Sequence, residues 1–357
     1  MSAHTLEPTH QLRAAFALSL AEMYGREVPA YTDLVDATRA INAAHAESLE
    51  DNDGLGSLQR ITAERHGAIR VGSPKELALV ARLFALLGMH PVGFYDLREA
   101  AARSAVPVVS TAFRPVDRVE LALNPFRVFT SMLVTDDARF FSGAALREKI
   151  ERAIDNRVMF QPELIALIEQ AEGQDGVSPE QAPAFIAAAT KAFELPSHAV
   201  DQVLYDQIHA VSPVAADIFF GLNINHLTPR VLDIDALHRV MEDERGIKMK
   251  DTIEGPPRRA AGAADVLLRQ TSFRSLPEPI RFLQPDGSVT EGTRRVRFGE
   301  VEQRGVAMTP AGRALYDDLL DTFESPPAES VGGAPCTHAE RWSEQYEAAM
   351  PKRSGWP

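Results

Sequence analysis

The chain has 357 residues, 45% hydrophobic and 24% charged, a balance that is typical of folded globular proteins and argues against disorder. Its formal net charge of -13 excludes a general attraction to nucleic acids or anionic membranes. The single cysteine, Cys336, excludes a disulfide framework and a thiolate metal site, and we interpret it as incidental. The sequence shows neither a secretory signal nor an apolar run of membrane-spanning length, so we expect a cytoplasmic protein.

Two helices are predicted first, over residues 11–23 and 32–49. A strand is predicted over 64–71. The following Ser73-Pro74-Lys75-Glu76 has the pattern of a helix start, with a Ser cap, Pro in the first turn and Glu at the capping-box position. This helix is expected to reach residue 87, and strands over 91–97, 105–113 and 128–134 follow. The order from residue 64 is therefore a strand, a helix and several strands.

Residues 142–211 are mostly helical in pattern, with a second start signal at Ser178-Pro179-Glu180-Gln181, and we interpret them as an insertion. A buried strand is then predicted over 216–227, a helix over 233–246, and strands over 247–255, 266–273 and 293–305. Thr309-Pro310 opens a last helix to residue 323. The first order thus recurs, which predicts an α+β fold of two strand–helix–strands units whose curved sheets face a common cavity.

These patterns divide the chain into five parts. We expect N-terminal helices over 1–60, the first unit over 61–141, the helical insertion over 142–212, the second unit over 213–323 and a linker-like tail over 324–357.

Two of the ten histidines, His66 and His226, lie in or at the end of the first strand of each unit. A single histidine in such a place is more often structural than a metal ligand. Their matched positions in the two units favour a shared role as ligands.

Arg70 lies four residues after His66 and shares its strand face with the small Ala68. Four strand residues span about 13 Å between Cα atoms, so the two long side chains can bracket a small molecule. A metal at one end and a guanidinium at the other suit a chelating group with a distant carboxylate. The alternative is a surface salt bridge from Arg70.

Glu300 and Glu302 lie two apart, on one face of the strand predicted over 293–305. Two carboxylates so placed suit a metal ligand with a supporting or substrate-binding group, and the alternative is a solvated, charged strand face. Two histidines and one carboxylate make the facial triad of non-haem iron(II) oxygenases. Strand alternation does not distinguish Glu300 from Glu302.

These residues resemble a known family. The set His66…Arg70, Asn225-His226-Leu227-Thr228-Pro229 and Phe298-Gly299-Glu300-Val301-Glu302-Gln303-Arg304-Gly305 is similar to the 2-oxoadipate dioxygenase/decarboxylase family of the vicinal oxygen chelate superfamily. The resemblance covers the chain from the helix containing Leu12 to the helix opened by Thr309. The last run also resembles the terminal strand of 4-hydroxyphenylpyruvate dioxygenase, where the glutamate two places after the Phe binds iron. That likeness selects Glu300 over Glu302.

The resemblance implies two βαβββ-type units around a metal cavity, with Fe(2+) held by His66, His226 and Glu300. It implies conversion of 2-oxoadipate and O2 to 2-hydroxyglutarate and CO2, with Arg70 on the distal carboxylate of the 2-oxo acid. Family members carry more C-terminal sequence, and we do not match the tail to them. The alternatives are another reaction of the superfamily (ring cleavage, or a metal-dependent lyase or isomerase) and a non-catalytic metal- or ligand-binding protein.

Overall fold

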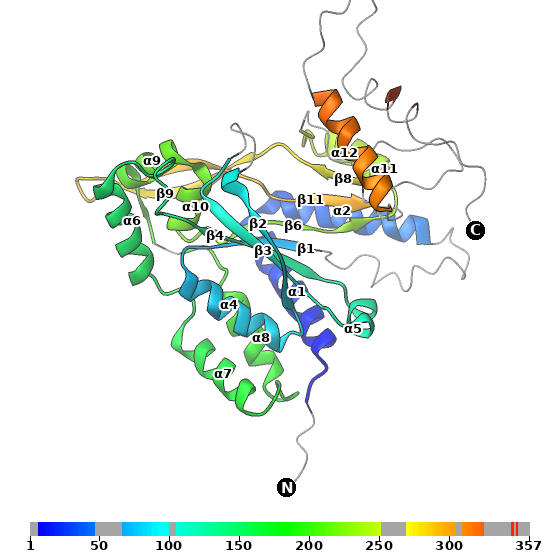
Figure 1. Ribbon diagram of the computed structural model, residues 1–357, viewed down its shortest axis with the longest axis horizontal. Helices are drawn as coiled ribbons and strands as arrows, with labels where there is room; N and C mark the ends of the chain where they lie inside the picture. The colour runs from blue at the N-terminus through cyan, green and yellow to red at the C-terminus, as the bar shows by residue number, and fades with distance from the viewer. Residues whose placement is uncertain are drawn as a thin grey trace, which may run out of the picture. The chain divides into compact units, whose positions relative to one another are not determined.

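The computed structural model describes residues 6–46, 66–99, 105–196, 198–250, 269–303 and 309–324, together with 344, 345 and 348 (Figure 1). The chain divides into two compact units. The first holds Met1–Asp36, Leu55–Pro229 and Ser275–Gly299, and the second holds Ala37–Gly54, Arg230–Arg274 and Glu300–Pro357. Cys336 and most of the expected tail lie outside the described residues. No helix in the described ranges is both long and apolar enough to span a bilayer.

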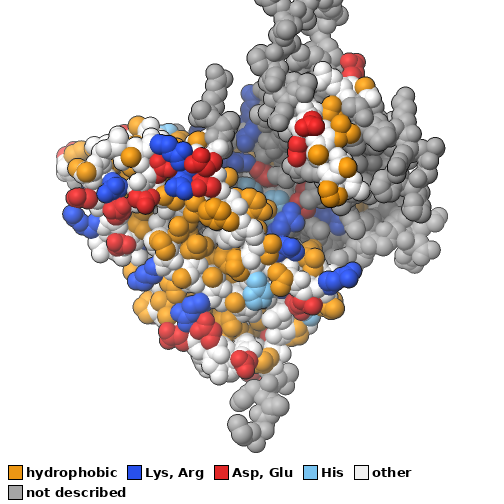
Figure 2. All heavy atoms as spheres, in the orientation of Figure 1, with side chains coloured by type: hydrophobic (Ala, Val, Ile, Leu, Met, Phe, Trp, Pro, Cys, Tyr) orange, Lys and Arg blue, Asp and Glu red, His pale blue; other side chains and the backbone are white. Residues whose placement is uncertain are grey.

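A five-stranded mixed sheet forms the centre of the first unit, in the order β2-β3-β4-β1-β6. Strand β1 is parallel to β4, and every other neighbouring pair is antiparallel. The edge strand β2 exposes Phe94 and Tyr95. Hydrophobic side chains are prominent over the middle of this unit in Figure 2, with charged groups around them. The strands span β1 (His66–Val71), β2 (His90–Asp96), β3 (Val108–Arg114), β4 (Arg127–Leu133) and β6 (Ile224–Thr228).

Helices α1 (Thr9–Glu27) and α4 (Pro74–Leu86) cover one face of this sheet (Figure 1). The Phe84 ring of α4 packs edge-on against Phe113 of β3 and against Phe16 of α1. Phe113 is in register with Val128 of β4, which is in register with Gly67 of β1, so these residues share the helix-covered face. Strand alternation therefore directs His66 and Ala68 to the opposite face.

The predicted helix start at Ser73 is confirmed. The Ser73 hydroxyl accepts a hydrogen bond from the Glu76 amide, and Pro74 occupies the first turn. The Glu76 carboxylate accepts from the Gly72 amide and pairs with Arg157, which also donates to the Ile218 carbonyl. These contacts connect the first turn of α4 to Arg157 and, through it, to the backbone at Ile218.

Helices also fill the predicted insertion. They are α6 (Ala144–Asn156), α7 (Pro162–Gly173), α8 (Ala182–Lys191) and α9 (Gln202–Val211). The second start signal acts one turn before α8, where the Gln181 side chain accepts from the Ser178 amide. Two short elements lie outside the insertion, the 3-10 turn η1 (Leu97–Glu99) after β2 and α5 (Arg118–Leu123) between β3 and β4.

The expected strand over 216–227 is wrong in its first half. Residues Pro213–Phe219 form helix α10, because the Ser212 hydroxyl caps the Ala215 amide and Pro213 occupies the first turn. Gly221 then takes a positive φ of 75°, which ends the helix and turns the chain into β6. The apolar run was ambiguous by periodicity alone, and the cap decides it.

The strand expected over 293–305 is also divided. Strand β10 (Val289–Val296) pairs with β9 (Leu276–Leu283), which the sequence did not indicate, and β9 pairs with the two-residue β5 (Val200–Asp201). The remaining part is β11 (Glu300–Gln303), in the second unit.

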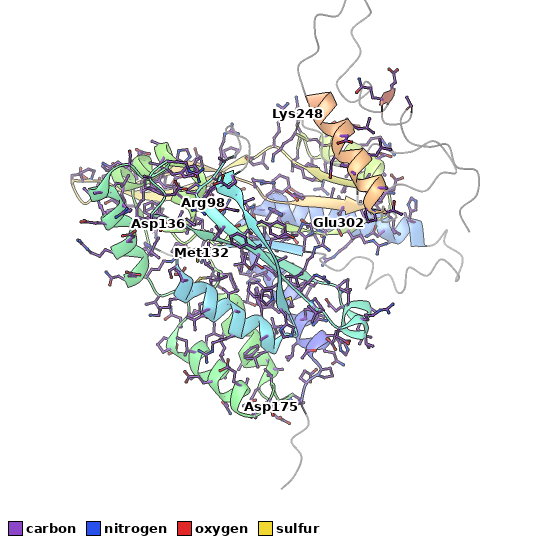
Figure 3. The ribbon with its side chains drawn as sticks, viewed as in Figure 1. Arg98, Met132, Asp136, Asp175, Lys248 and Glu302 are labelled. Carbon is purple, nitrogen blue, oxygen red and sulfur yellow. The ribbon has the colours of Figure 1, made fainter. Side chains whose placement is uncertain are left out.

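The second unit contains a small sheet in the order β7-β11-β8. It is formed by β7 (Arg230–Val231), β11 and β8 (Arg269–Ser272), and Glu302 of β11 is labelled in Figure 3. The Asn42 amide bonds to the Arg230 carbonyl and the Leu232 amide, which joins α2 (Pro29–Ala46) to β7. The helix predicted over 233–246 is α11 (Ile234–Arg239) followed by the π-turn η2 (Val240–Glu244), and Thr309 caps α12 (Pro310–Glu324) as expected.

Candidate metal centre

The structure brings His66 and His226 together in the first unit. His66 is in register with Thr228 of β6, and Ala68 is in register with His226. Directly opposed residues of an antiparallel pair share a face, so the two histidines are diagonal neighbours on one face of the sheet. Their ring centroids are 5.9 Å apart with an interplanar angle of 82°. Both side chains are buried, at 3% and 7% exposed.

A close backbone contact occurs at the residue just before Glu300, the predicted carboxylate ligand. Leu227 forms a parallel bridge with Gly299, the residue just before Glu300. A Cβ atom at Gly299 would lie 2.7 Å from Cδ2 of the buried Leu34 and 3.4 Å from the Leu227 carbonyl oxygen, so a side chain here would force Leu34 to move. Glu300 directly follows Gly299, and consecutive Cα atoms are about 3.8 Å apart. The Cα atom of Glu300 therefore lies one peptide unit from the residue that bridges Leu227, the neighbour of His226 in the chain.

The carboxylates of β11 are not a solvated strand face, so that alternative is wrong. Glu300 is 5% exposed and Glu302 is 1% exposed. Buried carboxylates need compensating charge or hydrogen bonds, because removing them from water is costly. Two imidazoles and one carboxylate are a donor set of the kind that binds a divalent metal. The buried pair of His66 and His226 is therefore a candidate metal site within the first unit, and Glu300 stays its predicted third ligand.

Arg70 is buried, which excludes the surface salt bridge considered as an alternative. Its guanidinium lies 2.9 Å from Oδ2 of Asp217 and donates a 2.6 Å hydrogen bond to Oδ1 of Asn225. Burial lowers the pKa of Arg70 and raises the pKa of Asp217, and the attraction between the two charges opposes both shifts. We regard the pair as ionised, because the two groups are in hydrogen-bonding contact.

A β-bulge explains how Asn225 reaches this network. Ala68 pairs with His226 but Ile69 pairs with Ile224, so Asn225 is the extra residue of β6. Regular alternation would direct neighbouring side chains to opposite faces, and a bulge re-aims one of them. The Asn225 amide nitrogen lies 2.9 Å from Nδ1 of His226, while its oxygen accepts from Arg70. The amide thus links the candidate metal ligand to the arginine.

Asp217 and Asn225 were not among the predicted site residues. Asp217 lies in α10, where the sequence predicted a strand. Asn225 is next to His226 in the chain, a position that alternation assigns to the other face. An Asn immediately before a candidate histidine ligand was the available signal, and it has meaning only once the bulge is known.

Comparison with known proteins supports the resemblance drawn from the motifs. The family model for 2-oxoadipate dioxygenase/decarboxylase matches residues 16–355, which includes the tail that the sequence motifs did not match. The 2-oxoadipate dioxygenase/decarboxylase of Mycobacterium tuberculosis is 54% identical over 334 residues, covering 93% of this chain and 79% of the relative. The crystal structure of hydroxyglutarate synthase from Pseudomonas putida in complex with 2-oxoadipate is 40% identical, with a TM-score of 0.79, and the match covers 96% of this chain and 74% of that one.

A more distant structure bears on the fold alone. A glyoxalase superfamily protein from Ralstonia eutropha is 19% identical, with a TM-score of 0.61, and the match covers 85% of this chain and 88% of that one. The mixed sheets and helices are thus consistent with a vicinal oxygen chelate-like fold. By the extent of the family match and the identity to its members, this chain belongs to the 2-oxoadipate dioxygenase/decarboxylase family.

Proposed function

We propose that the protein catalyses the oxidative decarboxylation of 2-oxoadipate with O2 to 2-hydroxyglutarate and CO2. The observation that carries the proposal is the buried pair of His66 and His226, linked by Asn225 to the buried cation Arg70 in a chain of this family. The relative from Pseudomonas putida whose structure contains 2-oxoadipate is named hydroxyglutarate synthase. The reaction balances, since the 2-oxo acid loses its C1 carboxylate as CO2 and both oxygen atoms of O2 enter 2-hydroxyglutarate, one in the new carboxylate and one in the new hydroxyl group.

We propose Fe(2+) as the metal, held by His66, His226 and Glu300. Two imidazoles and one carboxylate are the donor set of non-haem iron(II) oxygenases, and they leave positions open for a chelating 2-oxo acid and O2. Iron(II) would supply the electrons that activate dioxygen and would polarise the keto group. The protein's own part is to bury the donors, orient the His226 ring through Asn225 and exclude bulk water.

Arg70 is proposed to bind the distal carboxylate of the substrate. Its side chain lies on the same face of β1 as those of His66 and Ala68, because alternate residues of a strand share a face. Asp217 and Asn225 already hold it in a fixed orientation. A guanidinium so held recognises a carboxylate at little cost in side-chain entropy. This arrangement favours a dicarboxylic over a monocarboxylic 2-oxo acid.

At the level of architecture, we propose that residues 61–141 and 213–323 correspond to two vicinal-oxygen-chelate units around the metal. The helical insertion of 142–212 would separate them, with residues 1–60 and 324–357 as flanking parts. The β1 and β6 positions of the two histidines support this assignment, because each is the first strand of its part of the chain.

Oxygen consumption with a panel of 2-oxo acids tests the function. We expect activity with 2-oxoadipate, and its loss in His66→Ala and Glu300→Ala. His90→Ala, which changes an exposed histidine on the same sheet, is the matched control and should retain activity. Loss in Glu302→Ala with full activity in Glu300→Ala would show that the ligand assignment is wrong.

A spectroscopic test separates the oxygenase from the alternatives. Anaerobic Fe(2+) and 2-oxoadipate should give a visible charge-transfer band that fades when O2 is admitted. A band that persists in O2 would favour a non-catalytic binding protein. Turnover of a ring compound or a thioether without 2-oxo acid would favour another reaction of the superfamily.

A further inference from the structure

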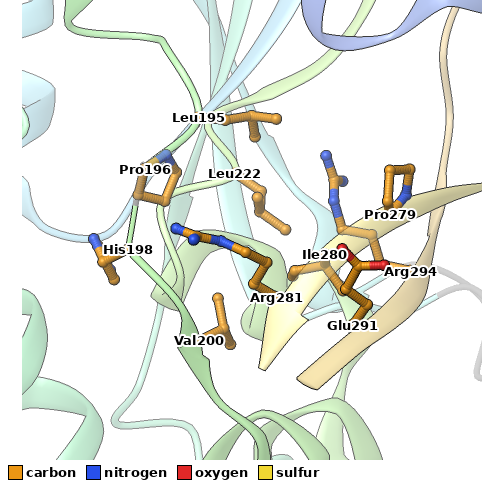
Figure 4. Close-up of a pocket in the computed structure, with 10 residues that line it drawn as sticks. All are labelled: Leu195, Pro196, His198, Val200, Leu222, Pro279, Ile280, Arg281, Glu291 and Arg294. Carbon is orange, nitrogen blue, oxygen red and sulfur yellow. The ribbon is translucent and has the colours of Figure 1, made fainter. Parts of the chain in front are cut away.

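A cavity lies in the first unit, and its lining residues do not include the two histidines (Figure 4). It has a volume of about 350 Å³ and is lined by residues of the β9–β10 hairpin together with Leu195, Pro196, His198, Val200 and Leu222. Its wall is largely apolar and includes Leu222 and Ile280. The polar groups on it are His198, Arg281, Glu291 and Arg294. A largely apolar cavity with a few polar groups is the usual form of a small-molecule site.

Arg294 is the unusual member of this wall. The side chain is only 9% exposed. In the part of the chain that the structure describes, its guanidinium neither forms an ion pair nor donates a hydrogen bond. Its positive charge is felt by Glu27, Asp217 and Glu278, whose carboxyl pKa values it lowers against the raising effect of burial.

The next residue of the strand, Arg295, has a different environment from Arg294. Arg295 follows on β10, points to the opposite face by alternation, is exposed and donates to the Ser275 carbonyl. Strand β10 therefore places Arg294 in the cavity and the next residue, Arg295, in solvent. A buried guanidinium without hydrogen-bond partners is unfavourable unless a ligand or water satisfies its five donors.

We propose that this cavity binds a small aliphatic carboxylate, with Arg294 holding the carboxylate group in a two-pronged contact. The planar fork of the guanidinium matches a carboxylate, and the apolar wall accommodates a short carbon chain. Arg281 and His198 add positive or donor groups along the same wall. The site does not include His66, His226 or Arg70, so its existence does not depend on the proposed reaction.

The test uses metal-free full-length protein and glutarate as the probe, because glutarate lacks the keto group that chelates a metal. Isothermal titration should show saturable binding that weakens at least tenfold in Arg294→Gln and is partly restored in Arg294→Lys. Arg295→Gln removes the same charge one residue away and should bind like the parent. Uncharged glutaramide should not bind.

A second variant, at an exposed residue of the same cavity, tests the proposal even if substitution of the buried Arg294 prevents folding. Arg281 is exposed on the neighbouring strand, and Arg281→Gln should fold normally and weaken glutarate binding by a few-fold. Circular dichroism and the melting temperature check each variant. Competition then identifies the source of the ligand: displacement of glutarate by 2-oxoadipate or 2-hydroxyglutarate assigns the site to those acids, and displacement by succinate alone assigns it to another organic acid.

Two outcomes would overturn the proposal. One is equal glutarate binding by well-folded Arg294→Gln and Arg295→Gln, or no binding by the parent. The other is glutarate binding that is lost in Arg70→Lys and kept in Arg294→Gln, which would place the anion at Arg70. Neither result bears on oxygen consumption by the iron-loaded enzyme, so the two proposals fail separately.

Discussion

The side-chain amide nitrogen of Asn225 lies 2.9 Å from Nδ1 of His226, the residue that follows it in the chain. Adjacent strand residues ordinarily face opposite sides of a sheet, and the contact exists because Asn225 is the extra residue of a β-bulge. Bulges are frequent beside active sites. The same amide accepts a hydrogen bond from Arg70, so one residue positions both a candidate metal ligand and a candidate substrate-binding group.

Replacing Asn225 should weaken metal binding. A ligating imidazole is oriented by the partner of its second nitrogen, and losing such a partner typically costs about 10- to 100-fold in metal affinity. We expect Asn225→Ala to lose affinity for Fe(2+) in this range, measured by anaerobic titration. Asn225→Asp keeps an acceptor for Arg70 and replaces the amide nitrogen facing Nδ1 of His226 by a carboxylate oxygen, which orients a ligating imidazole well, so it should bind at least as tightly as the parent. Equal affinity in parent and Asn225→Ala would exclude an orienting role.

Substitution of Arg70 should change substrate preference. Arg70→Lys keeps the charge opposite Asp217, and so avoids an unpaired buried carboxylate, but loses the planar fork. We expect kcat/KM for 2-oxoadipate to fall by about tenfold or more, because a charge-assisted bidentate contact is lost. The value for the monocarboxylic 2-oxohexanoate should change much less. A parallel fall for both acids would show that Arg70 does not discriminate the distal carboxylate.

Gly299 is predicted to be intolerant of a side chain. A Cβ atom there would meet Leu34 and the Leu227 carbonyl oxygen, and such overpacking costs about 1–3 kcal/mol. We expect Gly299→Ala to lower the free energy of unfolding by this amount in urea titrations. Gly173 ends helix α7, where an added Cβ atom would meet nothing within 4 Å, so Gly173→Ala is the control and should be neutral or slightly stabilising. Similar losses in both variants would contradict the packing argument.

Glu27 should make stability depend on pH. Burial raises the pKa of its carboxyl to about 7, while the Leu195 amide donates to it and opposes the shift. From its ordinary pKa of about 4.5 up to about 7, the folded state binds more protons than the unfolded state, so stability falls as pH rises through this window.

Glu27→Gln removes this titration. Its advantage over the parent should grow from pH 4.5 to pH 7 and then stay constant, as measured by urea unfolding at several pH values. Glu22→Gln changes an exposed carboxylate on the same helix and serves as the control. An advantage of Glu27→Gln that does not vary with pH would contradict the raised pKa.

The sequence by itself determined the features that depend on local chemistry. The Ser73 and Thr309 caps, the strand predicted over 64–71, and the helices of residues 142–211 follow from hydrogen bonding and periodicity over a few residues. The motifs around His66, His226 and Glu300 also identified the family, which the comparisons confirm. Glu300 as the ligand in preference to Glu302 remains a prediction.

Tertiary structure decided what depends on the pairing of distant segments. The register between β1 and β6 sets the diagonal contact of the two histidines, and its shift at the bulge turns Asn225 toward His226. Helix α10, which the sequence predicted as a strand, carries Asp217 to Arg70. The hairpin of β9 and β10 places Arg294 in a cavity and Arg295 in solvent. These outcomes follow from register and burial, because a one-residue shift in pairing reverses which side chains face inward.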